Sequence, residues 1–303
     1  MEQPSTAPDR APTSDRATLP TKPHTVEAGA GPRLALVIES GRRRLGFELG
    51  DLWAHRDLLY FLVWRDLKVR YKQTLLGVIW AVLQPLLTMA VFAIIFGRLA
   101  HVPSDGEPYP IFVFAGLLPW TYFNQAVISA SNSLVGNAAL ITKVYFPRLM
   151  IPGAAVCAGL VDFAISAAIM FLMAFHYGIH YGAGLLLIAP LMALTALFAL
   201  GVGMWMSALN VKYRDVRYAL PFMMQIWMYL TPVIYPLNFI PARWRWLLAL
   251  NPLSGIIQAF RAAVFGRVFD WNGLAISCAI TLAVLTCAGW AFRRMEREFA
   301  DIV

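Results

Sequence analysis

Six long apolar stretches constrain the fold of this 303-residue sequence more than any other feature. Each reaches the roughly 20 residues that a helix needs to cross the hydrocarbon core of a bilayer. Only 14% of the residues are charged, against about a quarter in soluble domains. We therefore predict an all-α integral membrane protein with six transmembrane helices, at residues 75–97, 111–135, 150–175, 184–209, 218–237 and 271–292.

The first 45 residues differ from the rest in composition, because they are rich in proline, alanine, threonine and arginine and have no sustained apolar face. They also lack the apolar core of a cleavable signal peptide. We predict a mostly disordered cytoplasmic extension over 1–45, an amphipathic interfacial helix region over 46–74 and the six-span membrane domain over 75–303.

Lysine and arginine gather at alternate ends of the predicted spans. Such residues are retained on the cytoplasmic side of a membrane, so the pattern places both termini in the cytoplasm. The last outer segment departs from this rule because it carries Arg243, Arg245, Arg261 and Arg267.

Residues 58–72 have the pattern of an amphipathic helix on the inner membrane surface. At 100° per residue, one face carries Tyr60, Val63, Trp64, Leu67 and Tyr71, and Arg65, Lys68 and Lys72 lie beside it. Asp66 and Arg70 are placed to form an i,i+4 ion pair on the other flank. The pattern fits two interpretations, an anchor that fixes topology or the frame of a lateral entrance for an anionic, lipid-linked substrate.

Two short inner loops, 135–152 and 209–221, end at prolines that restart the spans. In the second, Asn210 is placed to cap a short helix. A polar cluster follows, made of Lys212, Tyr213, Arg214, Asp215 and Arg217. Docking of a soluble partner and a solvated connector that only enforces topology both explain this cluster.

No Gly-x-x-x-x-Gly-Lys-Ser/Thr motif occurs in the sequence, and no glycine is followed by lysine. The chain therefore lacks the loop that cradles ATP phosphates. If transport is driven by ATP, the ATPase is a separate polypeptide that carries the ATP and magnesium. We expect no cofactor in this chain and no nucleic-acid partner.

Asp162 lies near the middle of the third predicted span, where an ionisable side chain costs on the order of 3 kcal/mol. It is a candidate to line a path or to bond a neighbouring helix. We favour the structural role, because no other span offers an obvious partner and because Gly159 and Ser166 permit close helix packing.

Five stretches carry a family resemblance: WRDLKVRYKQTLLGVIWAVLQPLL followed by FGRLA, GLLPWTYF, LITKVYFPRLMIP, LNVKYRDVRYALPF and TPVIYPLNFIPARWRWLLALNPLSGIIQAFR. In order and spacing they resemble the permease subunit of polysaccharide ABC exporters, the Wzm-like and TagG-like transporters of the ABC-2 class. The resemblance covers nearly everything from Leu52 to Phe299 and offers no role for the extension before residue 45.

This resemblance implies a homodimer with a translocation path between the subunits, driven by two copies of a separate ATP-binding subunit. It implies export of a lipid-linked polysaccharide, carried on undecaprenyl diphosphate, across the bacterial inner membrane. O-antigen is the first candidate cargo, and capsule and teichoic acid remain open.

The resemblance also assigns roles to residues of this sequence. The interfacial gate helix includes Tyr60, Trp64, Arg65, Lys68, Arg70 and Lys72. The two ATPase-coupling regions, 136–147 and 210–216, include Lys143, Tyr145, Lys212, Tyr213, Arg214 and Asp215. The outer gate is a pair of short re-entrant helices within 238–266, with Arg243, Trp244, Arg245, Trp246 and Arg261, whose arginines would reach water or phosphate. An exposed amphipathic hairpin without a gating role is the alternative.

A substrate path of sugar-binding aromatic rings is a further implication of the resemblance. Its candidates are Trp205, Phe222, Trp227 and Tyr229, and core packing is the commoner fate of such aromatic side chains. Asp162 joins them as a candidate for the path because of its charge in mid-span.

Three rival functions are weighed against export of a glycan. An exporter of a small amphipathic molecule would share the fold. An ion-coupled carrier would show several intramembrane ionisable residues and an internal repeat. A membrane enzyme acting on lipid-linked sugars would need converging acids, bases or metal ligands. His176 and His180 lie in a glycine-rich turn, and the three cysteines lack metal-ligand spacing, so we predict neither a metal site nor a catalytic site.

Overall fold

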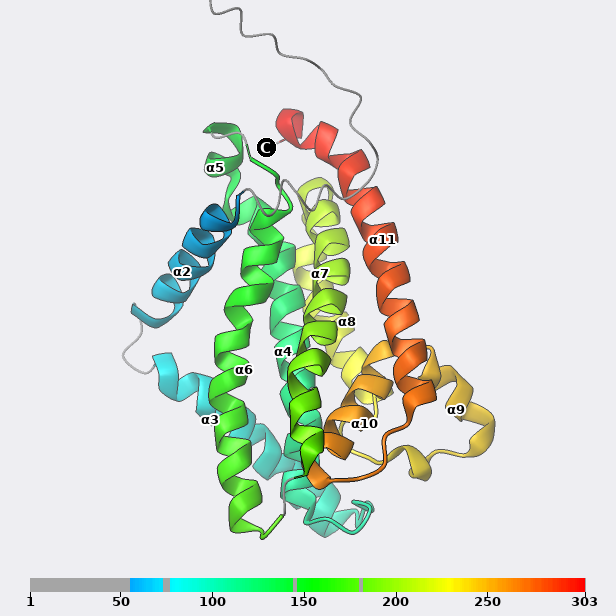
Figure 1. The fold of residues 1–303 in the computed structure, drawn as a ribbon. Coiled ribbons are helices and arrows are strands. Elements are labelled where there is room, and N and C mark those ends of the chain that lie inside the picture. The colour runs from blue at the N-terminus through cyan, green and yellow to red at the C-terminus, as the bar shows by residue number, and fades with distance from the viewer. Residues whose placement is uncertain (1–54, 73–76, 144–145, 180–181, 303) are drawn as a thin grey trace, which may run out of the picture. The chain divides into compact units, whose positions relative to one another are not determined.

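The computed structural model describes residues 55–72, 77–143, 146–179 and 182–302 (Figure 1). The predicted extension 1–45, Tyr145 and His180 lie outside these residues. Within the described ranges every regular element is helical. The α-helices are α2 (Arg56–Lys72), α3 (Gly77–Phe92), α4 (Tyr109–Gly136), α5 (Ala138–Lys143), α6 (Met150–His176), α7 (Ile188–Lys212), α8 (Val216–Leu230), α9 (Ala242–Ala249), α10 (Pro252–Phe265) and α11 (Trp271–Ile302). A π-helical segment, η1 (Ala93–Leu99), continues α3, and the short 3-10 helices are η2 (Ala183–Leu187) and η3 (Leu237–Phe239).

Five helices are long and apolar enough to cross a membrane, and a bent pair makes a sixth if it is counted as one span. The fifth predicted span, 218–237, is shorter than expected, because α8 ends at Leu230 after 15 residues. At 1.5 Å per residue this helix is about 22 Å long, against a hydrocarbon core of about 30 Å. It ends where it does because Thr231 precedes Pro232 and adopts an extended backbone, as residues before proline tend to do.

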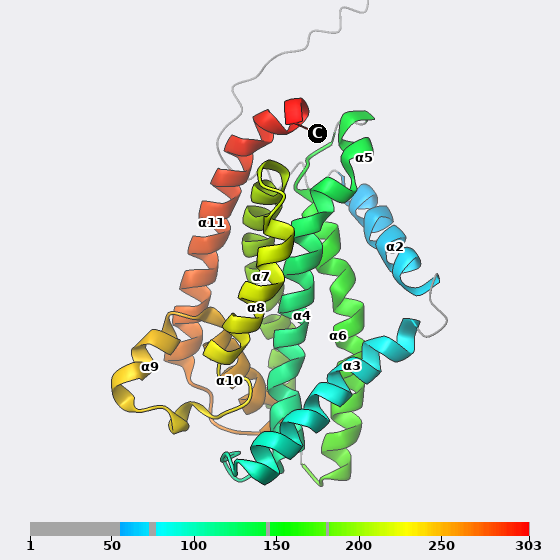
Figure 2. The same cartoon turned by 180° about the vertical axis from the view of Figure 1, so that it is seen from behind.

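Helix α4 lies at the centre of the bundle and packs against α6, α7 and α10 (Figures 1 and 2). Its first half is buried on all sides. Phe123 of α4 stacks on Phe198 of α7 with ring centroids 5.0 Å apart. At Gly203 of α7 a Cβ would come within 2.6 Å of the Ala130 side chain, so glycine allows α4 and α7 to approach closely.

The helix predicted over 58–72 is confirmed as α2, which runs beside the first half of α6. Leu62 is buried in a small cluster with Met150 and Ile151 of α6. Further along, Arg70 reaches Asp162, close to the midpoint of α6. Tyr60 and Trp64 are exposed, as a lipid-facing surface requires.

Helices α9 and α10 confirm the pair of short helices predicted before the last span, and they are bent by 100°. The bend is held by Asn251, whose side chain accepts a hydrogen bond from the Leu253 backbone N–H (3.2 Å). Its amide nitrogen also donates to the Thr231 hydroxyl (2.8 Å), which ties the bend to the end of α8. Pro252 then occupies the first helical position, where its missing N–H is not needed.

The loops of the bundle separate into two ends. Helix α5 and the α7–α8 connection lie at the end where α11 finishes, and α9, α10 and η1 lie toward the other end (Figures 1 and 2). The two predicted coupling regions therefore share one end, opposite the predicted outer gate.

Candidate functional site

Asp162 of α6 is held by two neighbouring residues of α2. Its carboxylate pairs with the Arg70 guanidinium through Oδ2 and accepts a hydrogen bond from the Tyr71 hydroxyl through Oδ1. The side chains of Asp162 and Arg70 retain 13% and 34% of their exposure. Burial raises the pKa of the Tyr71 phenol, and the bond to Asp162 acts in the same direction, so the phenol stays protonated and donates.

This cluster, Arg70, Tyr71 and Asp162, bears on two expectations. Asp162 does have a charged partner, but it comes from α2 and not from another span. The predicted Asp66–Arg70 pair is replaced by a pair between neighbours, Arg65 and Asp66, at 2.8 Å. The i,i+4 rule considers one helix alone, whereas the packing of α2 on α6 turns Arg70 toward a carboxylate in the neighbouring helix.

A cavity of about 400 Å³ adjoins this cluster, between α2, α3, α4 and α6. Three polar side chains of α4 line it at a spacing of four residues: Thr121, Gln125 and Ser129. Sequence reasoning missed this polar stripe, although the four-residue spacing of its polar side chains can be read from the sequence. Polar residues at i, i+4 and i+8 lie on one face of a span, and such faces usually meet protein or a water-filled cavity and not lipid.

Arg261, predicted to reach water or phosphate at the outer gate, is instead buried in the protein. Its guanidinium donates to the backbone carbonyls of Pro232 (3.0 Å) and Val233, just beyond the end of α8. It also lies 3.8 Å from the centre of the Phe112 ring. Gly116 leaves room for this contact, because a Cβ there would stand 2.6 Å from both the guanidinium and the Val233 carbonyl. Arg261 therefore satisfies carbonyls that the broken helix leaves unpaired.

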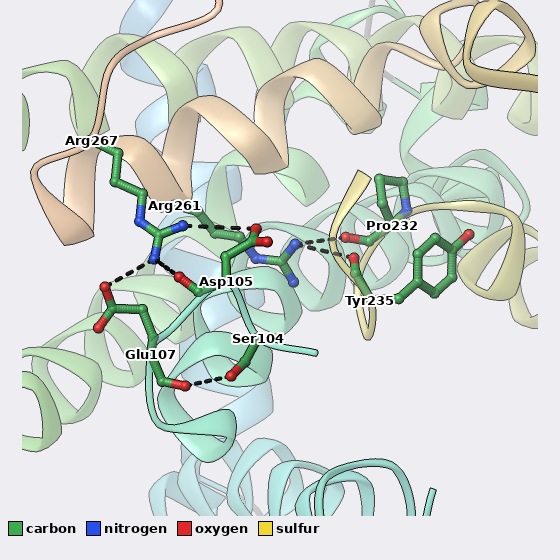
Figure 3. A network of polar contacts seen from close by, with 7 residues as sticks. All are labelled: Ser104, Asp105, Glu107, Pro232, Tyr235, Arg261 and Arg267. Atoms are coloured by element: carbon green, nitrogen blue, oxygen red, sulfur yellow. Dashed lines mark hydrogen bonds and ion pairs between the residues drawn. The ribbon is translucent and has the colours of Figure 1, made fainter. Parts of the chain in front are cut away.

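The other outer arginines behave differently. Arg267 bonds the loop before α4, through the Asp105 carbonyl oxygen (2.6 Å) and the Glu107 carboxylate (3.0 Å), as Figure 3 shows. Sequence reasoning did not single out these two acids, whose charge complements the arginine-rich outer segment. On α9, Arg245 donates to the Ile240 carbonyl (3.0 Å), and Arg243 lies 5.9 Å from the ring of Trp244. Trp244 and Trp246 are exposed.

The predicted coupling residues lie at helix ends. Lys143 ends α5, Lys212 ends α7, and Tyr213, Arg214 and Asp215 are exposed between α7 and α8. Asn210 does not cap a helix as expected. It is buried within α7, where its side chain donates to the Ser131 carbonyl (2.9 Å) and to the Asn132 side chain (3.2 Å) of α4.

The predicted path aromatics do not form one group. Phe222 and Tyr229 are exposed on α8, and Trp205 is exposed on α7. Trp227 packs edge-on against Phe123 (5.3 Å between centroids) and joins Trp205 at a second, apolar cavity of about 440 Å³. In the described part of the chain, no group of three or more histidines, cysteines or acids is placed to hold a metal ion.

Comparison with known proteins identifies the family. The model of the ABC-2 type transporter family matches residues 57–265. The O-antigen export system permease protein RfbA of Myxococcus xanthus is 31% identical over 260 residues, which cover 84% of this chain and 98% of that protein. A protein of the same name from Klebsiella pneumoniae is 29% identical over 262 residues, covering 86% and 99%. The polysialic acid transport protein KpsM of Escherichia coli is 24% identical over 258 residues, covering 84% and 97%. This chain is therefore a multi-pass membrane permease that belongs to the ABC-2 type transporter family.

Proposed function

We propose that this chain is the permease subunit of an ATP-driven exporter that carries a lipid-linked polysaccharide across the bacterial inner membrane. The observation that carries the proposal is the match, over nearly the whole length of the relatives, to permeases named for O-antigen export and polysialic acid transport. O-antigen is the first candidate cargo, because the two relatives named for it match with the higher identity. No covalent chemistry is assigned to this chain.

A permease of this family implies a partner ATPase. We propose that two copies dock at the end that carries α5 and the α7–α8 connection. The exposed Tyr213, Arg214 and Asp215, with Lys143 and Lys212 beside them, provide a polar surface there. Their place on short segments between long helices suits the transfer of a rigid-body motion into the bundle.

The second proposed partner is another copy of the chain. Tyr218, Phe222, Gln225 and Tyr229 of α8 follow one another at spacings of three and four residues, so they share one face, and all four are exposed. Gln225 makes no side-chain hydrogen bond within the described residues, and lipid tails offer an amide no partner. A second subunit across a polar path would cover this face and meet Gln225, whereas bare lipid would not.

The export step is tested by depleting this subunit in its native cell and extracting lipid-linked glycans from the membranes. We expect a glycan polymer on the lipid carrier to accumulate on the cytoplasmic side, while surface glycan falls. Complementation with the intact gene should reverse both effects. Normal surface glycan without accumulation would contradict the proposal and favour export of a small amphipathic molecule.

A further inference from the structure

The cavity beside Asp162 has features of a built binding site. Its wall carries the hydroxyl and amide groups of Thr121, Gln125 and Ser129 on α4 and of Gln84 on α3. None of these four side chains has a hydrogen-bond partner among the described residues. In a span, polar groups that bond nothing within the protein are unfavourable unless another polar molecule meets them. The cavity volume of about 400 Å³ lies within the roughly 300–1,000 Å³ of small-ligand pockets.

The charge of this cavity argues against an anion as its ligand. Of the described residues that line it, only Arg70 and Asp162 are charged, and they neutralise each other. A phosphate at Arg70 would place its negative charge beside the Asp162 carboxylate, which already neutralises the guanidinium. Like charges at such short range repel, most strongly away from water.

The remaining chemistry fits an uncharged ligand with many hydroxyl groups. Glutamine amides and hydroxyls both donate and accept, so they match hydroxyl and acetamido groups in either direction. Trp80, Tyr122 and Phe163 line the same cavity and offer apolar ring surfaces to C–H groups. Amides and hydroxyls at the edges and flat aromatic rings at the faces suit a sugar ring.

We propose that the cavity between α2, α3, α4 and α6 binds an uncharged sugar ring of the lipid-linked cargo and does not bind its phosphate. This inference rests on the proposed function. It adds a sugar subsite within a single subunit, separate from the exposed face of α8. Gln125, at the centre of the α4 stripe, is placed to determine specificity, because its neighbours Thr121 and Ser129 flank it one turn away on either side.

The test uses the full chain in lipid nanodiscs and two probes, undecaprenyl diphosphate carrying one N-acetylhexosamine and bare undecaprenyl diphosphate. We expect the sugar-bearing probe to bind about tenfold more tightly, which is the effect of one or two neutral hydrogen bonds. Gln125→Met should remove most of this preference, and Ser129→Ala should reduce it by a few fold. Gln258→Met on α10 is the matched control and should retain the full preference, since Gln258 does not line the cavity.

Thermal unfolding of each variant separates loss of binding from loss of folding, and Ser129→Ala remains informative if Gln125→Met does not fold. Equal binding of the two probes would overturn the proposal, because the phosphate would then account for recognition. A sugar preference that survives both variants would also overturn it. If the wild-type chain binds neither probe, the sugar subsite is wrong, whereas accumulation of glycan on depletion would still support export.

Discussion

At the scale of single residues, the charges inside the bundle are explained by contacts between helices. An unpaired Asp162 carboxylate in the middle of α6 would carry a large free-energy cost. Arg70 neutralises it and Tyr71 donates to its second oxygen, so the carboxylate has partners on both sides. The pair also explains how the arginine in the last turn of α2 is accommodated beside the middle of α6.

A double-mutant cycle tests this pairing. We expect Arg70→Met to lower the free energy of unfolding by about 2–3 kcal/mol, because Asp162 is left without its cation. This loss is at the lower end of the range for buried ion pairs, because the Arg70 side chain is one-third exposed. Asp162→Leu alone should be similarly harmful. The double variant should recover a large part of the loss, with a coupling above about 1 kcal/mol in thermal unfolding in detergent. Strictly additive effects would show that the two side chains do not interact.

At the scale of the elements, the short helix α8 and the bent pair α9–α10 are joined by hydrogen bonds at the end of α8. Helix α8 ends at Leu230 because of Pro232, and the carbonyls beyond its end are taken by Arg261 from α10. Asn251 then connects the bend between α9 and α10 to Thr231. A break in a transmembrane helix is tolerated where neighbouring groups satisfy the freed carbonyls, and α10 provides them.

Arg261→Met should therefore destabilise the protein by roughly 3 kcal/mol or more, since two or three buried carbonyls lose their donor while the apolar stem is retained. Arg261→Lys should fall between that variant and the wild type, because one ammonium does not reach all the carbonyls. Arg98→Met is the control, and because Arg98 is exposed at the end of η1 we expect a change within about 0.5 kcal/mol. Thermal unfolding measures all three. An equally small effect at Arg261 would contradict its role.

At the scale of the whole molecule, the two ends of the bundle carry different kinds of segment (Figure 1). One end carries α5 and the α7–α8 connection, with exposed charged residues, and the other carries α9, α10 and the loop that Arg267 holds. The long helices α4, α6 and α7 pack together between them, an arrangement that suits the rigid-body movement proposed for ATPase coupling.

The proposed docking of the ATPase predicts an asymmetry between these ends. Arg214→Glu reverses an exposed charge in the α7–α8 connection and should weaken copurification of the ATPase by about five- to tenfold, as expected for roughly 1 kcal/mol at an interface. Arg98→Glu makes the same change at the opposite end and should leave copurification unchanged. Loss in both variants, or in neither, would argue against the coupling surface.

The sequence by itself determined that the protein is helical and crosses the membrane. It also located four spans, the helix α2 before them and the short helices before α11 within a few residues. Hydropathy suffices for this because lipid forces each span to satisfy its own backbone. Only the tertiary structure decided the partners of Arg70, Asn210 and Arg261. Arg70 and Asp162 are 92 positions apart, and Asn210 and Ser131 are 79 apart. Such contacts depend on which helices pack together, and that arises from side-chain fit across the bundle, which no periodicity along the chain records.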